Sequence, residues 1–347
     1  MQQMQIKVMV VDDSALMRKF LSEIMESDDQ LTLIATARNG EDALNKIKKY
    51  KPDVLTLDID MPKLNGIETL KRIMMENPMP VIMVSSHTIR GSRVTVEALS
   101  LGAVDFVTKP SLMNDQGVEE LNRMLPLKIK EAARARINPG FALTSRMNYK
   151  VTKSASGRAA RQIVAIGAST GGPRALVEVV SSFPKDFPAA VFITQHMPAG
   201  FTRSLAARLD KAAMIKVQEA ASGDKILEGE AYLAPGGYHL MVTKEATTIL
   251  SDAAQVNHVR PSVDVMMESL ADLYGPDMVG VILTGMGRDG CEGMAAIKAK
   301  GGKTVVQDPS QAVIPSMPQA VIKRGLADII VPLEQIGGAI YRMIMNL

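Results

Sequence analysis

Acids, a hydroxyl and a lysine end short apolar runs in the first third of the sequence. Asp12 and Asp13 follow IKVMVV, Asp58 follows VLTL, Ser85 follows IMV and Lys109 follows FVT. Carboxylates that lie together repel one another unless a hard cation neutralises them, and Mg²⁺ prefers such oxygen ligands. A carboxylate beside a metal ion, a lysine and a hydroxyl can accept a phosphoryl group. We therefore expect Asp12, Asp13 and Asp58 to bind Mg²⁺, and Asp58 to be the phosphoacceptor.

A second chemical pattern begins at Ser169, which follows the run IVAIGA and precedes GGP. Pro173 suits the first turn of a helix, so the serine lies between a strand end and a helix N-terminus. Backbone donors and the positive helix end would stabilise an oxyanion there. GASTGG is also glycine-rich, as phosphate-binding loops are, but it has neither their lysine nor GxGxxG spacing. The motif alone leaves nucleophile and phosphate loop open.

A nucleophilic serine needs a base and an acid that orients the base. His196 ends the run AAVFITQ and is our candidate base, and His258 in the loop NHVRPSVD is its rival. His239 lies inside a short strand, where we expect a structural or surface role. Asp289 follows VGVILT within TGMGRDG, although Asp-Gly is also a common turn. Three strand ends that bring Ser, His and Asp to one rim provide the geometry of acyl transfer.

The elements that position these residues alternate between strands and helices. Such alternation predicts parallel sheets covered by helices on both faces. It is interrupted over 137–161, where Ser, Gly and basic residues predict an exposed linker. We expect two doubly wound, mostly parallel α/β domains, 1–125 and 161–347, joined by a helix and linker over 126–160. The predicted strands include 6–11, 31–37, 54–57, 81–84, 105–107, 231–234, 239–242, 279–284 and 303–306, and the predicted helices 14–25, 40–49, 67–76, 94–101 and 117–136.

Composition narrows the class of protein. The 347 residues carry a net charge of +3, which does not indicate a nucleic-acid partner. The single cysteine excludes an intrachain disulfide framework. We read no signal peptide at the N-terminus and no apolar stretch of membrane-spanning length. A cytoplasmic protein without membrane insertion is expected.

The first domain resembles response-regulator receiver domains. VVDDS, LDIDMPKLNG, VSS and VTKP match four motifs of that family in order. Each acid alone could be a helix cap, but four matches at consecutive strand ends favour the receiver. The resemblance implies a flavodoxin-like fold and a histidine kinase as phosphodonor. It also implies that Phe106 is a switch aromatic whose rotamer follows Ser85 towards the phosphate.

The second domain resembles chemotaxis protein-glutamate methylesterases of the CheB type. The resemblance is carried by IGASTGGP, ITQHMPAGFT, RPSVDV, ILTGMGRDG and QDPSQAV. It implies a Rossmann-like domain that hydrolyses γ-glutamyl methyl esters on methyl-accepting chemoreceptors, releases methanol, needs no cofactor, and in many members deamidates receptor glutamines. Carried over, Ser169 is the nucleophile, His196 the general base and Asp289 its orienter. Thr170 and the backbone of Met286 match positions that flank the oxyanion.

Other functions are compatible with parts of this pattern. The second domain could be a binding module without catalysis, or the chain a DNA-binding regulator, although no basic recognition helix is evident after the linker. Cys291 has the character of a small buried residue rather than a nucleophile. Arg203 and Arg260 could hold an acidic receptor surface or be simple solvated or structural arginines. We expect the unphosphorylated receiver to cover the rim that carries Ser169, and the linker to permit its release.

Overall fold

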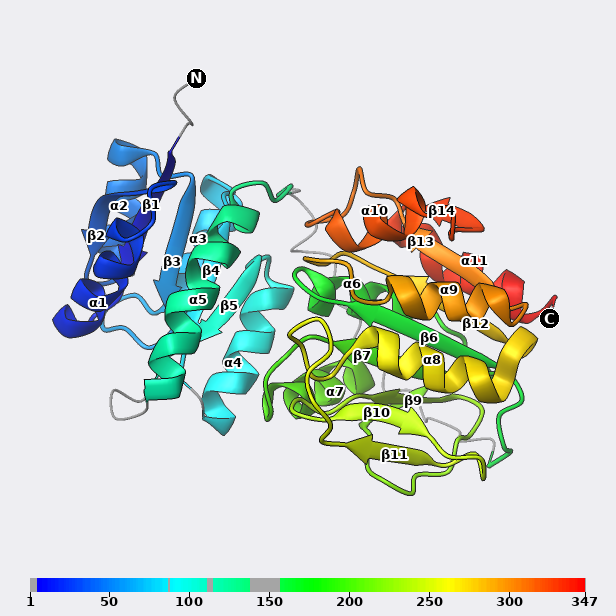
Figure 1. The fold of residues 1–347 in the computed structure, drawn as a ribbon. Helices are drawn as coiled ribbons and strands as arrows, with labels where there is room; N and C mark the ends of the chain where they lie inside the picture. The colour runs from blue at the N-terminus through cyan, green and yellow to red at the C-terminus, as the bar shows by residue number, and fades with distance from the viewer. Residues whose placement is uncertain (1–4, 87, 111–114, 138–156, 347) are drawn as a thin grey trace. The chain divides into compact units, whose positions relative to one another are not determined.

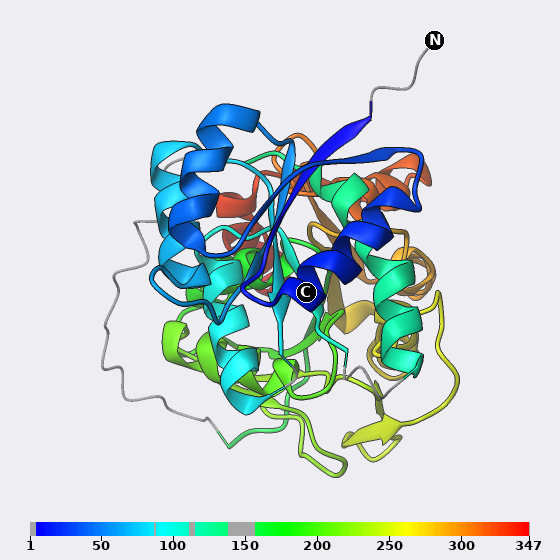
Figure 2. The same ribbon diagram turned by 90° about the vertical axis from the view of Figure 1, so that its left-hand side faces the viewer.

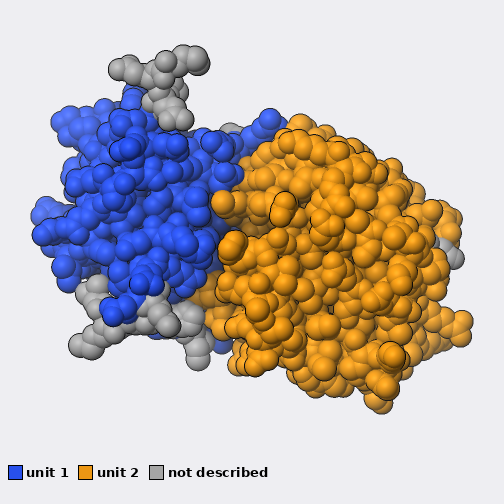
Figure 3. Space-filling model, in the orientation of Figure 1, with its two compact units in different colours: residues 1–146 blue, residues 147–347 orange. Residues whose placement is uncertain are grey.

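The computed structural model describes residues 5–86, 88–110, 115–137 and 157–346. The chain divides into two compact units, residues 1–146 and 147–347, which Figure 3 shows in different colours. Each unit contains a mostly parallel sheet with helices on both faces, so the prediction of two α/β domains is confirmed. The predicted linker falls largely on residues 138–156, which lie outside the described residues.

Five parallel strands form the sheet of the first unit: β1 (Ile6–Val11), β2 (Leu31–Ala37), β3 (Val54–Asp58), β4 (Val81–Ser85) and β5 (Asp105–Thr108). Their order is β2-β1-β3-β4-β5 (Figure 1). β3 and β4 are buried along their whole length, as expected for central strands of a sheet covered on both faces. The strand order reverses between β1 and β3, and ligands of such folds bind at the carboxyl ends of the strands beside that reversal.

The helices of the first unit are α1 (Ala15–Glu26), α2 (Gly40–Tyr50), α3 (Gly66–Glu76), α4 (Ile89–Ser100) and α5 (Asp115–Ala132). Figure 2 shows α1 and α5 on one face of the sheet, and α2, α3 and α4 on the other. A polar side chain caps the N-terminus of each of the first four helices. The cap of α4 is Thr88, which explains why this helix begins five residues before the predicted start at Val94.

Seven parallel strands form the larger sheet of the second unit: β6 (Ile163–Ala168), β7 (Ala190–Gln195), β8 (Lys216–Glu219), β9 (Glu230–Leu233), β12 (Met278–Ile282), β13 (Lys303–Gln307) and β14 (Ile329–Val331). Their order is β14-β13-β12-β6-β7-β9-β8. The central strand β6 therefore has β7 on one side and β12 on the other, and the strand order reverses at β6. A separate antiparallel pair consists of β10 (His239–Val242) and β11 (Thr248–Ser251).

Six α-helices and one 3₁₀ turn, η2 (Gly275–Asp277), complete the described part of this unit. The α-helices are α6 (Gly172–Ser181), α7 (Phe201–Ala212), α8 (Val263–Tyr274), α9 (Cys291–Ala299), α10 (Ser316–Lys323) and α11 (Leu333–Ile344). α8, α9 and α10 pack in succession on one face of the sheet, whereas α6 contacts both α7 and α11 on the other (Figure 1). The core contains fully buried aliphatic, methionine and aromatic side chains, among them Phe192 and Met266.

The predicted strands 31–37 and 239–242 agree with the structure at both ends. The prediction for 279–284 is too long, because β12 ends at Ile282 and the Thr284 hydroxyl bonds the backbone of Thr170 and Ile314 instead. The sequence did not indicate β8, β11 or β14, which have only three or four residues each. Within the described ranges, the structure has no helix that combines the length and the apolar character required to cross a bilayer.

Candidate functional site

The three predicted hydrolytic residues follow three adjacent strands of the second unit. Ser169 follows β6 and His196 follows β7, and the last residues of these strands, Ala168 and Gln195, are paired in register. The backbone N–H of His196 donates to the carbonyl of Ala168 at 3.2 Å. Asp289 comes from the loop after β12, on the other side of β6. The residues therefore lie at the switch point of the sheet, where α/β folds bind their ligands.

Ser169 is held by its backbone. Its N–H donates to the carbonyl of Thr284 at 3.0 Å, and its carbonyl accepts from Gly172 N at 2.8 Å and from Gln195 Nε2 at 2.9 Å. Gly285 packs against it so closely that a Cβ at 285 would lie 2.8 Å from Ser169 Cβ. Within the described part of the chain, the Ser169 hydroxyl has no hydrogen-bond partner. The nucleophile candidate is thus rigidly placed while its reactive group stays free.

Asp289 is a buried carboxylate surrounded by hydrogen-bond donors. Its Oδ2 lies 2.8 Å from His196 Nε2 and accepts from Val263 N at 2.6 Å, while its Oδ1 accepts from Ser262 Oγ at 2.8 Å. Ser262 is the N-cap of α8, so the carboxylate sits at the positive end of that helix. Burial acts to raise the pKa of Asp289, but the bonds from His196 and the helix N-terminus hold that pKa well below its usual range.

His196 is the histidine that the structure joins to a carboxylate. Because Asp289 engages Nε2, the nitrogen left for a serine proton is Nδ1. The rival His258 is exposed and forms no hydrogen bond to a described residue. His239 is buried, accepts from Ser262 N at Nδ1 (3.1 Å) and lies 3.1 Å from the Ala254 carbonyl at Nε2. His239 thus supports the N-terminus of α8, which agrees with the structural role expected for it.

The residues predicted beside the oxyanion lie on two loops of this rim. Thr170 is buried, and its carbonyl accepts from the Thr284 hydroxyl at 2.9 Å. Met286 lies on the loop that also carries Asp289, and no described acceptor takes its backbone N–H. Its neighbour Gly285 donates to Ile314 O at 3.0 Å, so only the Met286 donor of this pair is free.

The other side chains singled out from the sequence have local partners. Cys291 is buried, with its Sγ 3.5 Å from the carbonyl of Ala320, as expected for a structural thiol. Arg203 pairs with Glu219 at 3.3 Å, although its side chain is 85% exposed. Arg260 Nη1 donates to the carbonyls of Asp252 and Ala253 and so braces a loop.

Three residues around Asp289 were not identified from the sequence: Ser262, Asn257 and Asp264. Asn257 Nδ2 donates to Asp289 Oδ1 at 3.2 Å and to Asp264 Oδ2 at 3.0 Å. Asp264 is 4% exposed, and burial together with the charge of Asp289 raises its pKa to about 7. The sequence did contain one signal for Ser262. A serine directly before an apolar stretch with helical periodicity, here the stretch from Val263, is typical of a helix N-cap.

The first unit has its own polar site at its switch point. Lys109 Nζ lies 2.8 Å from Oδ2 of both Asp12 and Asp58. Oxygens of Asp12, Asp13 and Asp58 lie within 4.8 Å of one another. Apart from that ammonium group, the buried Oδ2 atoms of Asp12 and Asp58 meet no described donor, so a hard cation suits this set of oxygens. Burial, helped by the charge of Asp12 and opposed by Lys109, raises the pKa of Asp58 to about 6.

The predicted switch residues lie on the strands next to this site. Ser85 is fully buried, and its hydroxyl accepts from Thr95 Oγ1 at 2.6 Å rather than meeting Asp58. Its carbonyl accepts from Lys109 N at 2.7 Å, which ties the ends of β4 and β5 together. Phe106 is buried, and the Lys128 ammonium lies 5.5 Å from the centre of its ring.

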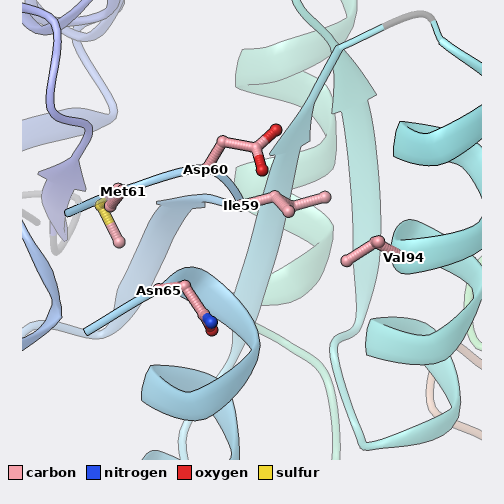
Figure 4. A pocket seen from close by; sticks show the side chains of 5 residues that line it. All are labelled: Ile59, Asp60, Met61, Asn65 and Val94. Atoms are coloured by element: carbon pink, nitrogen blue, oxygen red, sulfur yellow. The ribbon is translucent and has the colours of Figure 1, made fainter. Parts of the chain in front are cut away.

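A pocket opens beside the end of β3, immediately after Asp58. Ile59 and Val94 point towards one another across it, and Asn65 lies at the start of α3 (Figure 4). Asp60 and Met61 complete the lining. The pocket is therefore part of the same carboxyl-terminal edge as the acidic cluster.

Two family models match the chain. The response regulator receiver domain matches residues 8–120, and the CheB methylesterase model matches residues 164–340. The chain is 44% identical to a protein of Symbiobacterium thermophilum over 98% of its own length and 97% of the relative's. It is 45% identical to a protein of Pyrococcus horikoshii over 95% of its own length and 91% of the relative's. Both relatives bear the name protein-glutamate methylesterase/protein-glutamine glutaminase.

A solved structure is similar to the second unit. It is the catalytic domain of the CheB methylesterase of Thermotoga maritima, with a TM-score of 0.51 and 40% sequence identity. The match covers 52% of this chain and 97% of that domain.

Proposed function

Because the chain belongs to the CheB methylesterase family, we propose that Ser169, His196 and Asp289 catalyse its hydrolytic reaction. That reaction is the hydrolysis of glutamate methyl esters and glutamine amides in chemotaxis proteins, and the receiver domain subjects it to control by phosphorylation. The observation that carries the assignment is the 2.8 Å contact between His196 and the buried Asp289 carboxylate, which come from the loops after the two strands that flank β6, the strand that Ser169 follows.

In the first half-reaction, Ser169 Oγ attacks the carbonyl carbon of the glutamyl ester while His196 Nδ1 takes its proton. The charged Asp289 stabilises the imidazolium that forms and holds the ring in orientation. The free N–H of Met286 suits the oxyanion of the tetrahedral intermediate, and Thr170 lies on the neighbouring loop. His196 then gives its proton to the departing methoxy group, and methanol leaves behind an acyl-enzyme.

In the second half-reaction, His196 removes a proton from a water molecule that attacks the acyl carbon. The Ser169–acyl bond breaks, Ser169 regains a proton from His196, and the glutamic acid side chain that forms loses its remaining proton to solvent to give a carboxylate. A glutamine side chain follows the same route with ammonia as the leaving group. One triad thus accounts for both activities in the names of the relatives.

Ser169→Ala tests the assignment. Methanol release from a methylated chemoreceptor should fall at least about a thousandfold, since removal of the nucleophile disables the whole triad. Ser181→Ala is the matched control, because Ser181 is exposed at the end of α6 and, among the described residues, its hydroxyl bonds the Glu178 carbonyl alone. A native rate of methanol release by Ser169→Ala would refute the assignment.

For the receiver, we propose that Asp58 accepts the phosphoryl group from the chemotaxis histidine kinase, and that Asp12, Asp13 and Asp58 hold Mg²⁺. The cation would neutralise charge on the phosphoryl group during transfer. Lys109 pairs with the same carboxylates, and Ser85 and Phe106 would respond as switch residues. The buried, otherwise unpartnered oxygens of Asp12 and Asp58 support a cation at this site.

We further propose the division into a receiver over 1–125, a helix and linker over 126–160, and a catalytic domain over 161–347. The substrates would be methyl-accepting chemoreceptors. Because receptor signalling helices and their kinase meet in the cytoplasm, the enzyme would act there, without nucleic acid and without insertion into the membrane.

A further inference from the structure

A two-residue turn lies over the buried carboxyl groups of the hydrolytic site. Val256 and Val259 exchange backbone hydrogen bonds of 3.2 and 3.0 Å, and the two residues between them, Asn257 and His258, have φ values of 53° and 63°. Two consecutive left-handed residues are typical of a type I′ turn, in which asparagine is favoured. The turn therefore fixes the direction of the Asn257 side chain.

The amide of Asn257 joins two acids. Its Nδ2 donates to Asp264 Oδ2 at 3.0 Å and to Asp289 Oδ1 at 3.2 Å. Asp264 and Asp289 are 4% and 3% exposed, whereas Asn257 is exposed, so its amide is the outermost member of this network. The amide group has two N–H donors, so it can bond one carboxyl group with each and hold the two carboxyl groups at a fixed separation.

The two acids are not equivalent. Asp289 accepts from His196, Val263 N and Ser262, and it also accepts from Asp264 N at 3.3 Å. Asp264 accepts from Gly293 N at 2.8 Å. Ionising both of two adjacent buried carboxyl groups costs much free energy. We therefore assign the negative charge to Asp289, which accepts more hydrogen bonds than Asp264 does. The raised pKa of Asp264 agrees with this division.

We propose that Asn257 is a positioning residue of the hydrolytic reaction, whose amide ties Asp289 to Asp264 and so fixes the carboxylate that orients His196. This inference rests on the proposed function, in which Asp289 is the orienter. Asn257 does not touch the substrate; it acts through Asp289. A positioning role alters the rate of the chemical step and leaves substrate affinity unchanged.

The first test is Asn257→Gly in the full chain. Glycine keeps the left-handed backbone of the turn and removes only the amide. We expect kcat for methanol release to fall about 10- to 100-fold at unchanged KM, the effect known for outer hydrogen-bond partners of metal-bound histidines. His258→Asn is the matched control, because it changes the next residue of the same turn, tolerates the left-handed conformation and should keep native kcat.

The second test exchanges the two side chains. Asn257→Asp alone puts a third carboxyl group beside the pair and should reduce kcat more than Asn257→Gly does. The double variant that adds Asp264→Asn again has one amide between two carboxyl groups. Because the two side chains are in contact and act as a coupled pair, we expect its kcat to be at least about tenfold higher than that of Asn257→Asp. Additive losses in the double variant would show that the two side chains do not act together, which would contradict the proposed tie between Asp264 and Asp289. This exchange decides the question even if Asn257→Gly fails to fold.

A third readout does not depend on activity. The proton between His196 Nε2 and Asp289 should give a downfield NMR signal in the native chain and in His258→Asn, and this signal should broaden or vanish in Asn257→Gly. If the native chain released no methanol, the proposed function would fail while the NMR signal still tested the contact. Native kcat and an intact signal in Asn257→Gly, or a change in KM alone, would overturn the inference.

Discussion

Asp289 is 3% exposed, yet hydrogen bonds from His196 and from the start of α8 favour its charged form. Asp289→Asn preserves the size of the side chain and removes the charge that, in the proposed mechanism, stabilises the imidazolium of His196. We expect kcat for methanol release to fall about 10⁴-fold, as in serine proteases with the same replacement, while KM changes little.

The control for this prediction is Asp272→Asn, since Asp272 lies on α8 with its side chain 77% exposed and pairs with Lys300. Steady-state kinetics on methylated receptor measures both variants. A loss of less than tenfold in Asp289→Asn, or an equal loss in Asp272→Asn, would contradict the role of the charge.

Asp58 gives a pH prediction at the receiver site. Burial raises its pKa to about 6 in the metal-free protein. Mg²⁺ needs the ionised carboxylate, so protons compete with the cation, and Mg²⁺ affinity should weaken progressively as the pH falls below about 6. Calorimetric titration of the full chain at pH 7.5, 6 and 5 measures this. An affinity that is constant over this range, or equal in the native chain and Asp58→Asn, would contradict the site.

At the scale of elements, the loop after β12 approaches Ser169 so closely that no space is left for a side chain at Gly285. A Cβ at Gly285 would lie 2.8 Å from Ser169 Cβ and 2.2 Å from Met317 Sδ. Gly285→Ala must therefore displace Ser169 or the loop. We expect a loss of stability of about 1–3 kcal/mol and a fall in kcat of at least about tenfold.

Gly338→Ala provides the comparison for that variant. Gly338 is exposed on α11 with ordinary space around it, so alanine should leave kcat unchanged and stability equal or slightly higher. Urea unfolding and methanol release measure both variants. Native kcat in Gly285→Ala would show that the close approach does not position Ser169.

The elements also explain what the sequence could predict. Ser169 and His196 were located because apolar β-branched runs mark strands and because the carboxyl ends of parallel strands meet at one edge. Asn257 and Ser262 could not be assigned, since their contacts with Asp289 span 32 and 27 residues and depend on how the preceding loop folds back. The short strand β14 was not predicted, because three residues are too few to show a periodic pattern in the sequence.

At the scale of the whole molecule, the two polar sites belong to different units. The acidic cluster with Lys109 lies in the first unit, and Ser169, His196 and Asp289 lie in the second. We expect phosphorylation of the first unit to change the rate of hydrolysis in the second, which is a coupling between two distinct sites.

Such coupling predicts three different responses to a small phosphodonor such as acetyl phosphate with Mg²⁺. The native chain should accelerate methanol release at least about fivefold, the lower range of allosteric couplings. Asp58→Ala should stay at the basal rate, because it lacks the acceptor. A fragment of residues 157–347 should release methanol faster than the unphosphorylated chain and should not respond to the phosphodonor, because we expect the unphosphorylated receiver to inhibit the catalytic unit. If the fragment only matched the basal rate, phosphorylation would activate the catalytic unit directly, and the receiver would not inhibit it.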